Sequence, residues 1–160
     1  YSMTGWRIGF AGGPEPLIRA IAKIQSQSTT NPCSISQAAA VAALTGDESF
    51  LVDWTDAFRR RRDNVAGALN AVPGLSCRVP EGAFYVYPSC AGLVGKSTPD
   101  GTTINDSGDL ATYLLDQVGV AVVPGAAFGL EPFFRISYAT SDSALEDACN
   151  RIAQACADLE

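Results

Sequence analysis

Residues 1–10 read YSMTGWRIGF and place a single arginine in a short apolar run, with a glycine two positions away on either side. Side chains alternate between the two faces of a β-strand, so a strand here would put Arg7 on the same face as Gly5 and Gly9. The result would be an open, cationic notch. A guanidinium in such a place is costly without an anion, and its fork of donors suits phosphate or carboxylate, so Arg7 is a candidate anion-binding residue.

A second arginine stands in a similar setting near the other end of the chain. Arg135 lies within the run FFRISYA at 133–139, where Phe134 and Ile136 would occupy the opposite face of a strand. Two lone arginines in apolar strands indicate two anion sites. Structural salt bridges explain the same pattern equally well, because ion pairs that only support a fold also place arginines among apolar residues.

Five motifs follow one another along the chain in a fixed order. After the first nine residues come NPCSISQ (31–37), PEGAFYVYP (80–88), VPGAAFG (123–129) and FRISYA (134–139). In this order they resemble the pyridoxal-phosphate-dependent aminotransferases of fold type I, and most resemble the bacterial aspartate aminotransferases, including members that also act on prephenate. The resemblance runs from the first residue to the last helix.

The resemblance implies a role for each arginine. Arg7 would bind the phosphate of pyridoxal 5'-phosphate, and Arg135 would bind the α-carboxylate of the amino-acid substrate. It also implies that Phe84 places an aromatic ring near the substrate, although the sequence alone is better explained by a core aromatic residue there. No metal-binding residue is expected.

The same resemblance implies that the Schiff-base lysine of the family lies just upstream of Tyr1. No catalytic residue is therefore expected within this chain, because Lys23 and Lys96 lie in neither a motif nor a spacing that could replace that lysine. We expect the chain to be the C-terminal half of an enzyme, and we expect this half alone not to transaminate.

The expected activity of the complete enzyme is transfer of an amino group between an amino acid, aspartate or glutamate, and a 2-oxo acid. Three alternatives stay open: a prephenate-type aminotransferase, a pyridoxal-phosphate lyase of the same fold, and a non-catalytic module that binds a metabolite. In many relatives a Gly-Glu-Gly loop precedes the arginine strand, whereas this chain has Leu130-Glu131-Pro132, which leaves the side-chain specificity open.

Composition agrees with a soluble metabolic enzyme. The 160 residues are 47% hydrophobic, enough for a sizeable core, and the net charge of -6 argues against nucleic-acid and anionic-membrane partners. Five cysteines without a Cys-x-x-Cys pair, and the absence of histidine, favour reduced thiols and a cytoplasmic location over a metal site. The run Arg59–Arg62 fans around a helix and is expected to pair with Asp56 and Asp63. A homodimer is implied by the resemblance.

The expected fold class is α/β, the C-terminal portion of the fold type I transferases. Residues 1–45 would end the large cofactor-binding domain, 46–72 would form a long connecting helix, and 73–160 would form the small α+β domain. The patterns predict a strand at 6–10, helices at 14–24, 34–44, 51–72, 110–118 and 143–159, paired strands at 76–79 and 83–87, and further strands at 120–123 and 133–138. Ser143 and Glu146 suggest a capping box for the last helix, and 96–108 reads as an exposed excursion.

Overall fold

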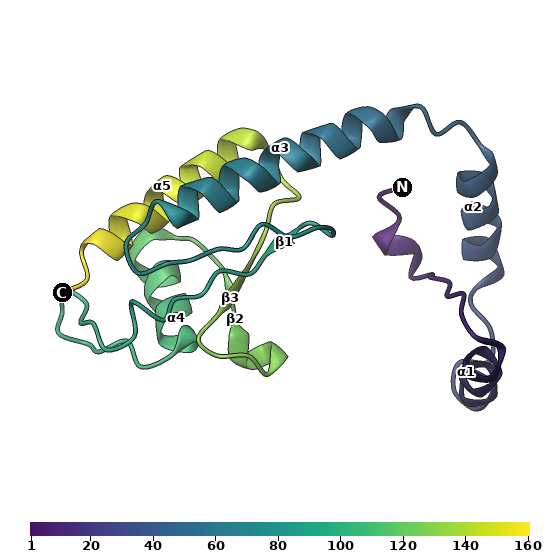
Figure 1. Ribbon diagram of the computed structural model, residues 1–160, viewed down its shortest axis with the longest axis horizontal. Coiled ribbons are helices and arrows are strands. Elements are labelled where there is room, and N and C mark those ends of the chain that lie inside the picture. Colours follow the sequence, from purple (N-terminus) through teal and green to yellow (C-terminus); the bar gives the residue numbers. More distant parts are fainter. The chain divides into compact units, whose positions relative to one another are not determined.

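The computed structural model describes all of residues 1–160, and the chain divides into two compact units, an N-terminal unit (Tyr1–Trp54) and a C-terminal unit (Thr55–Glu160) (Figure 1). The elements are, in order, η1 (Thr4–Trp6), α1 (Glu15–Gln27), α2 (Ser34–Thr45), α3 (Phe50–Asn70), β1 (Tyr85–Val86), α4 (Ser107–Val118), β2 (Val123–Pro124), η2 (Gly125–Phe128), β3 (Phe134–Ser137) and α5 (Asp142–Ala157). The predicted helices are therefore all present. None of the helices combines the length and the apolar character that crossing a bilayer requires.

The strand predicted at residues 6–10 is absent. Thr4–Trp6 forms a 3₁₀ turn instead, and Arg7 follows it in the left-handed region with φ of 51°. The turn is closed by local hydrogen bonds, from the Arg7 amide to the Thr4 carbonyl oxygen and from the Trp6 amide to the Met3 carbonyl oxygen. A strand needs a neighbour to accept and donate its backbone bonds, and the N-terminal unit contains no strand at all, so the backbone satisfies itself locally.

Most large apolar side chains on the helices of the N-terminal unit are exposed to solvent. Pro14 and Pro16 mark the start of α1, where a missing N–H costs nothing, and the alanine-rich α2 begins after Cys33. The only buried residue of the unit is Ser36, whose hydroxyl donates to the Trp6 carbonyl oxygen at 2.8 Å. Phe10 is 88% exposed. Most of the large apolar side chains of α1 and α2 therefore stay exposed within the unit.

The sheet of the C-terminal unit is antiparallel and small. Its strand order is β1-β3-β2, so β3 is the central strand, with Val86 opposite Ile136 on one side and Val123 opposite Arg135 on the other. Residues 76–79, which were predicted to pair with 83–87, form only a single bridge between Ser76 and Ser89. β1 pairs with β3 instead, because burial of Val86 and Phe134 favours the strand that carries a matching apolar face.

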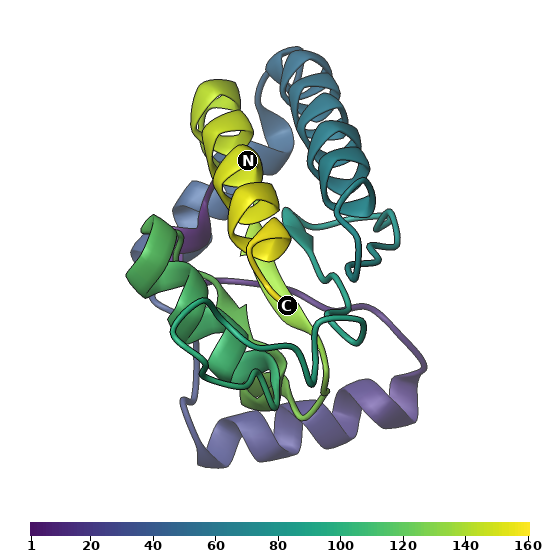
Figure 2. The same cartoon turned by 90° about the vertical axis from the view of Figure 1, so that its left-hand side faces the viewer.

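One continuous core lies among α3, α4, α5 and the sheet. Helix α4 packs against β2, η2 and α5, and α5 lies beside α3 (Figures 1 and 2). The fully buried members come from each of these elements and from the loops between them: Val65, Leu69, Val86, Leu93, Ile104, Leu110, Leu114, Phe134, Tyr138 and Ile152. The loop at 96–108 is exposed at 99–103, 105 and 106, as its composition predicts, but Thr98, Ile104 and Ser107 within it are buried.

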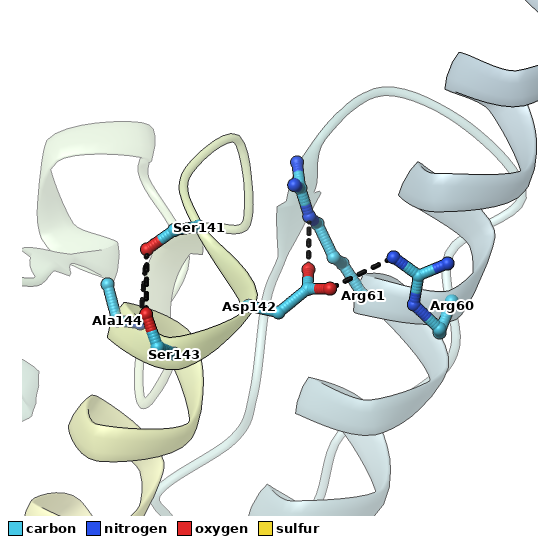
Figure 3. Close-up of polar contacts among 6 residues, drawn as sticks. All are labelled: Arg60, Arg61, Ser141, Asp142, Ser143 and Ala144. Atoms are coloured by element: carbon cyan, nitrogen blue, oxygen red, sulfur yellow. Dashed lines mark hydrogen bonds and ion pairs between the residues drawn. The ribbon is translucent and has the colours of Figure 1, made fainter.

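The start of α5 differs from the predicted capping box. Ser141, not Ser143, is the N-cap, and its hydroxyl accepts the Ala144 amide at 3.2 Å. The next residue, Asp142, ties α5 to α3 by accepting hydrogen bonds from Arg61 at 2.6 Å and Arg60 at 2.9 Å (Figure 3). These two bonds lower the pKa of the Asp142 carboxyl.

The other two arginines of the run at 59–62 pair as predicted. Arg59 binds Asp56, and Arg62 binds Asp63. Aspartates therefore pair with all four arginines of the run. These ion pairs account for the arginines without a nucleic-acid contact.

Candidate functional site

Arg135 occupies the middle of β3, the central strand of the sheet. Its neighbour Phe134 points to the other face and is fully buried in the core, so the alternation of the strand directs Arg135 away from the core. The pairing of Tyr85 with Ser137 places Tyr85 diagonally next to Arg135 on the same face of the sheet. The prediction of a strand around Arg135 is confirmed.

Two aromatic rings contact the Arg135 guanidinium. Its central carbon lies 4.4 Å from the centroid of the Tyr85 ring and 4.6 Å from the centroid of the Phe128 ring. Both distances fall within the range of cation–π attraction. The guanidinium is thus oriented by ring faces.

No carboxylate of the C-terminal unit lies within ion-pair distance of Arg135. Most other arginines of this unit do pair with an aspartate. They are Arg59, Arg60, Arg61, Arg62 and Arg151. Arg135 therefore has no carboxylate partner in its unit that would make it half of a structural salt bridge. The N–H donors of its guanidinium are available to an anion.

Phe128 owes its position to the turn that precedes it. The amide of Gly125, the first residue of η2, donates to the Phe133 carbonyl oxygen at 2.7 Å and to the Ser107 hydroxyl at 2.9 Å. A Cβ at Gly125 would overlap the carbonyl oxygen of Leu130, so the close approach of these backbones requires glycine.

The loop Leu130-Glu131-Pro132 is anchored to the start of α4. The Glu131 carboxylate accepts the hydroxyl of Ser107 at 2.7 Å and its amide at 3.1 Å. The Pro132 carbonyl oxygen accepts the Cys90 amide at 2.9 Å. This loop is therefore bonded to two other segments of the same unit.

Phe84 lies next to this group of residues but is partly buried against the core. Its ring centroid is 4.4 Å from that of Tyr85, and its carbonyl oxygen accepts the Tyr138 amide at 2.9 Å. The rings that contact the Arg135 guanidinium are those of Tyr85 and Phe128. A contact between Phe84 and a substrate stays a prediction.

Arg7 belongs to the N-terminal unit and is exposed. One of its guanidinium nitrogens donates to the Thr4 carbonyl oxygen at 3.1 Å, and no carboxylate of the unit pairs with it. Positions Gly5 and Gly9 have open space where a side chain would begin. The openness expected around Arg7 is present, although a turn produces it in place of a strand.

The sequence patterns did not single out Tyr85 and Phe128 as neighbours of Arg135. A signal for Tyr85 was present, because strand alternation places Tyr85 on the face opposite to that of the core residue Val86. Phe128 had no such signal, since it reaches Arg135 through the fold of η2.

The sequence profile of the family described as aminotransferase class I and II matches residues 1–152. The chain belongs to this family. Its relatives include the aspartate aminotransferase of Rhizobium meliloti strain 1021, 61% identical over 98% of this chain and 38% of the relative. They also include the aspartate/prephenate aminotransferase of Cereibacter sphaeroides, 57% identical over 99% of this chain and 40% of the relative.

Solved structures of the family share the fold. The crystal structure of the aspartate aminotransferase from Rhizobium meliloti superposes with a TM-score of 0.87 at 59% identity, covering 100% of this chain and 40% of the other. The Thermus thermophilus aspartate aminotransferase with maleate gives a TM-score of 0.76 at 41% identity, covering 96% of this chain and 38% of the other. The expected fold is confirmed: the chain has the fold of the C-terminal part of a fold type I aminotransferase, and it spans about 40% of the length of these relatives.

Proposed function

We propose that the protein containing this chain uses pyridoxal 5'-phosphate to transfer an amino group between an amino acid, aspartate or glutamate, and a 2-oxo acid. The observation that carries the proposal is the 61% identity to the Rhizobium meliloti aspartate aminotransferase over 98% of this chain. The maleate named with the Thermus thermophilus structure is a dicarboxylate, which supports a substrate with two carboxylates.

Arg7 is the residue of this chain that we propose for the cofactor phosphate. Its guanidinium is exposed and has no carboxylate partner in the N-terminal unit. A guanidinium can donate two parallel hydrogen bonds to the oxygens of a phosphate. The donor chemistry therefore fits the group. When bound, pyridoxal 5'-phosphate supplies the electron sink for charge that develops at the substrate α-carbon.

Arg135 is the residue that we propose for the substrate α-carboxylate. Paired hydrogen bonds to both carboxylate oxygens would restrict rotation of the substrate and keep the bond to be broken aligned. Phe84 is proposed as a further substrate contact. The lysine that the reaction requires is proposed to lie outside residues 1–160, because Lys96 donates to the Leu159 carbonyl oxygen at 2.9 Å and Lys23 is exposed on α1.

We also propose a division of the chain into domains. Residues 1–45 would belong to the large cofactor-binding domain, 46–72 to a connecting helix and 73–160 to the small domain. The span of α3, Phe50–Asn70, supports this division. We also propose that the complete protein is a homodimer, supported by the exposed apolar side chains of the N-terminal unit, among them Phe10, Ile24 and Ile35. A cytoplasmic location is part of the same proposal.

The test is an assay of the full-length protein, loaded with pyridoxal 5'-phosphate, for formation of oxaloacetate from L-aspartate and 2-oxoglutarate. Oxaloacetate formed in proportion to enzyme concentration is the expected result. A loaded protein that forms none would overturn the proposal.

A second candidate substrate is prephenate. It is favoured by the 57% identity to the Cereibacter sphaeroides enzyme that is named for both aspartate and prephenate. The same protein should then consume prephenate with L-aspartate or L-glutamate as amino donor, and comparison of the two kcat/KM values decides which acceptor is preferred.

A further inference from the structure

Tyr85 and Phe128 reach the Arg135 guanidinium from two different elements, β1 and the end of η2. The two rings do not contact each other, although each ring centroid lies within 4.6 Å of the same guanidinium carbon, so they approach it from different sides. Aromatic faces meet a guanidinium across its plane and leave the donors at its edge free. Tyr85 and Phe128 therefore restrict the guanidinium from two sides.

Each of the two rings is itself held in place. Tyr85 packs on Phe84, with ring centroids 4.4 Å apart. Phe128 meets Tyr87 edge to face at 6.1 Å, and Tyr87 stacks on Phe133 at 5.6 Å with the planes 6° apart. An arginine side chain loses rotamer freedom when it binds a ligand, and neighbours that restrict it beforehand reduce that loss.

We propose that Tyr85 and Phe128 are positioning residues that orient the Arg135 guanidinium to receive the substrate α-carboxylate. The inference rests on the proposed function, in which Arg135 binds that carboxylate. Because the α-carboxylate is common to all amino acids, loss of this orientation should weaken the binding of every amino-acid substrate by a similar factor. The effect on discrimination between substrates should be small.

A purely structural role for the two rings predicts something different. If the contacts served only to stabilise the fold, weakening them would lower the melting temperature and leave carboxylate affinity unchanged. The two roles can be separated by changing the charge distribution of the ring while keeping its size nearly constant, because the cation–π attraction depends on the negative ring face.

The experiment replaces Phe128 in the full-length, cofactor-loaded protein with 4-fluoro-, 3,5-difluoro- and pentafluoro-phenylalanine, which withdraw progressively more charge from the ring face. Maleate is the probe for binding, measured by calorimetry, and L-aspartate and L-glutamate are the substrates. We expect the Kd of maleate to rise stepwise, by about fivefold or more in total, with KM for both substrates rising in parallel and the melting temperature nearly constant. Phe128→Leu should raise the Kd of maleate as much as the most fluorinated ring does, and Phe128→Tyr should keep an affinity close to that of the wild type.

Phe58 provides the matched control. The Arg61 guanidinium lies over its ring at 5.8 Å, a cation–π contact to which the proposal gives no role in binding. The same fluorinated series at Phe58 should leave the Kd of maleate unchanged. A flat series at Phe128 in a protein that binds maleate would refute the positioning role alone. A wild-type protein that neither binds maleate nor transaminates would refute the proposed function and the inference with it.

Discussion

At the scale of single residues, the charge of Arg135 is the one most directly open to test. Replacing Arg135 with alanine in the full-length protein removes the donors for the substrate carboxylate, and such charge-assisted bonds contribute about 1.5–3 kcal/mol each. We expect kcat/KM for L-aspartate to fall by about 10- to 100-fold or more, while the absorbance of the bound cofactor is retained.

The control for this change is Arg59→Ala, which breaks only the exposed ion pair with Asp56. Exposed pairs contribute little, so activity should stay close to that of the wild type. If Arg135→Ala were as active as Arg59→Ala, Arg135 would not be the carboxylate ligand.

The cysteines differ in the pH at which they should react. Backbone N–H groups of Ser36 and Ile35, at the start of α2, lower the pKa of the exposed Cys33 thiol from its usual 9.0. Burial raises the pKa of Cys90 and of Cys156 to about 11. Only the thiolate is nucleophilic, and a lowered pKa means more thiolate at a given pH, so Cys33 should reach half its maximal alkylation rate below pH 9.0.

The measurement is a time course of iodoacetamide alkylation of the full-length protein at several pH values, with each site followed by mass spectrometry. Cys33 should be modified first, and the buried thiols only at higher pH or on unfolding. The same protein in concentrated urea is the control, because the lowered pKa of Cys33 depends on the folded start of α2. A Cys33 profile identical in the folded and unfolded chain would contradict the prediction.

At the scale of secondary-structure elements, the start of α5 separates two serines that look equivalent in the sequence. The hydroxyl of Ser141 accepts the Ala144 amide, whereas Ser143 lies inside the first turn. Removing an N-cap side chain costs about 1 kcal/mol. Ser141→Ala should therefore lower the free energy of unfolding by about 1 kcal/mol in urea titrations, and Ser143→Ala should change it much less. A larger effect of Ser143→Ala would instead support the capping box predicted from the sequence.

Turn η2 depends on the absence of a side chain at Gly125. Gly125→Ala would push a methyl group into the Leu130 carbonyl oxygen, so the turn must shift and carry Phe128 with it. We expect both a lower melting temperature and a weaker affinity for maleate in the full-length protein. Gly67→Ala is the matched control, since Gly67 lies within α3 with open space at its Cβ position. Retention of maleate affinity in Gly125→Ala would show that η2 does not determine the position of Phe128.

The elements that the sequence predicted correctly are those whose signal is local. Helices α1 to α5 follow from apolar periodicity and from breakers such as Pro73 and Gly74, and the strand around Arg135 follows from alternation. The strand at residues 6–10 and the pairing of 76–79 were wrong, because a strand exists only where another strand accepts its backbone bonds. The loop at 96–108 is largely exposed as predicted, but the burial of Ile104 within it was missed for a related reason, since that burial depends on distant segments.

The candidate site shows the same limit. Arg135 could be proposed from the sequence because a charge in an apolar strand is conspicuous, and Arg7 because it stands in an apolar run with a glycine two positions away on either side. Phe128 could not, because its contact with Arg135 depends on the Gly125 turn and on the bonds from Ser107 and Glu131.

At the scale of the whole molecule, the two units differ in how they bury apolar surface. The core of the chain lies within the C-terminal unit, whereas the N-terminal unit buries no hydrophobic side chain. Helices of the length of α1 are marginal in water without a packed face. The stability of the N-terminal unit should therefore depend on surfaces that residues 1–160 do not supply.

Hydrogen exchange tests this dependence. In the chain of residues 1–160, amides of α1 and α2 should exchange orders of magnitude faster than those of α4 and α5, because local opening of the first two exposes little additional apolar surface. In the full-length protein the exposed side chains Ile21, Ile24 and Leu44 should be covered by the rest of the molecule or by a second copy, and exchange in α1 and α2 should slow accordingly. The two kinds of cover can be separated by measuring exchange in the full-length protein over the concentration range in which light scattering detects its dimer. Protection that appears only with dimerisation assigns these faces to the subunit interface. Protection that is already complete in the monomer assigns them to contacts with the rest of the same chain. Exchange in α1 as slow as in α5 in the chain of 160 residues would contradict the idea that the N-terminal unit lacks a core of its own.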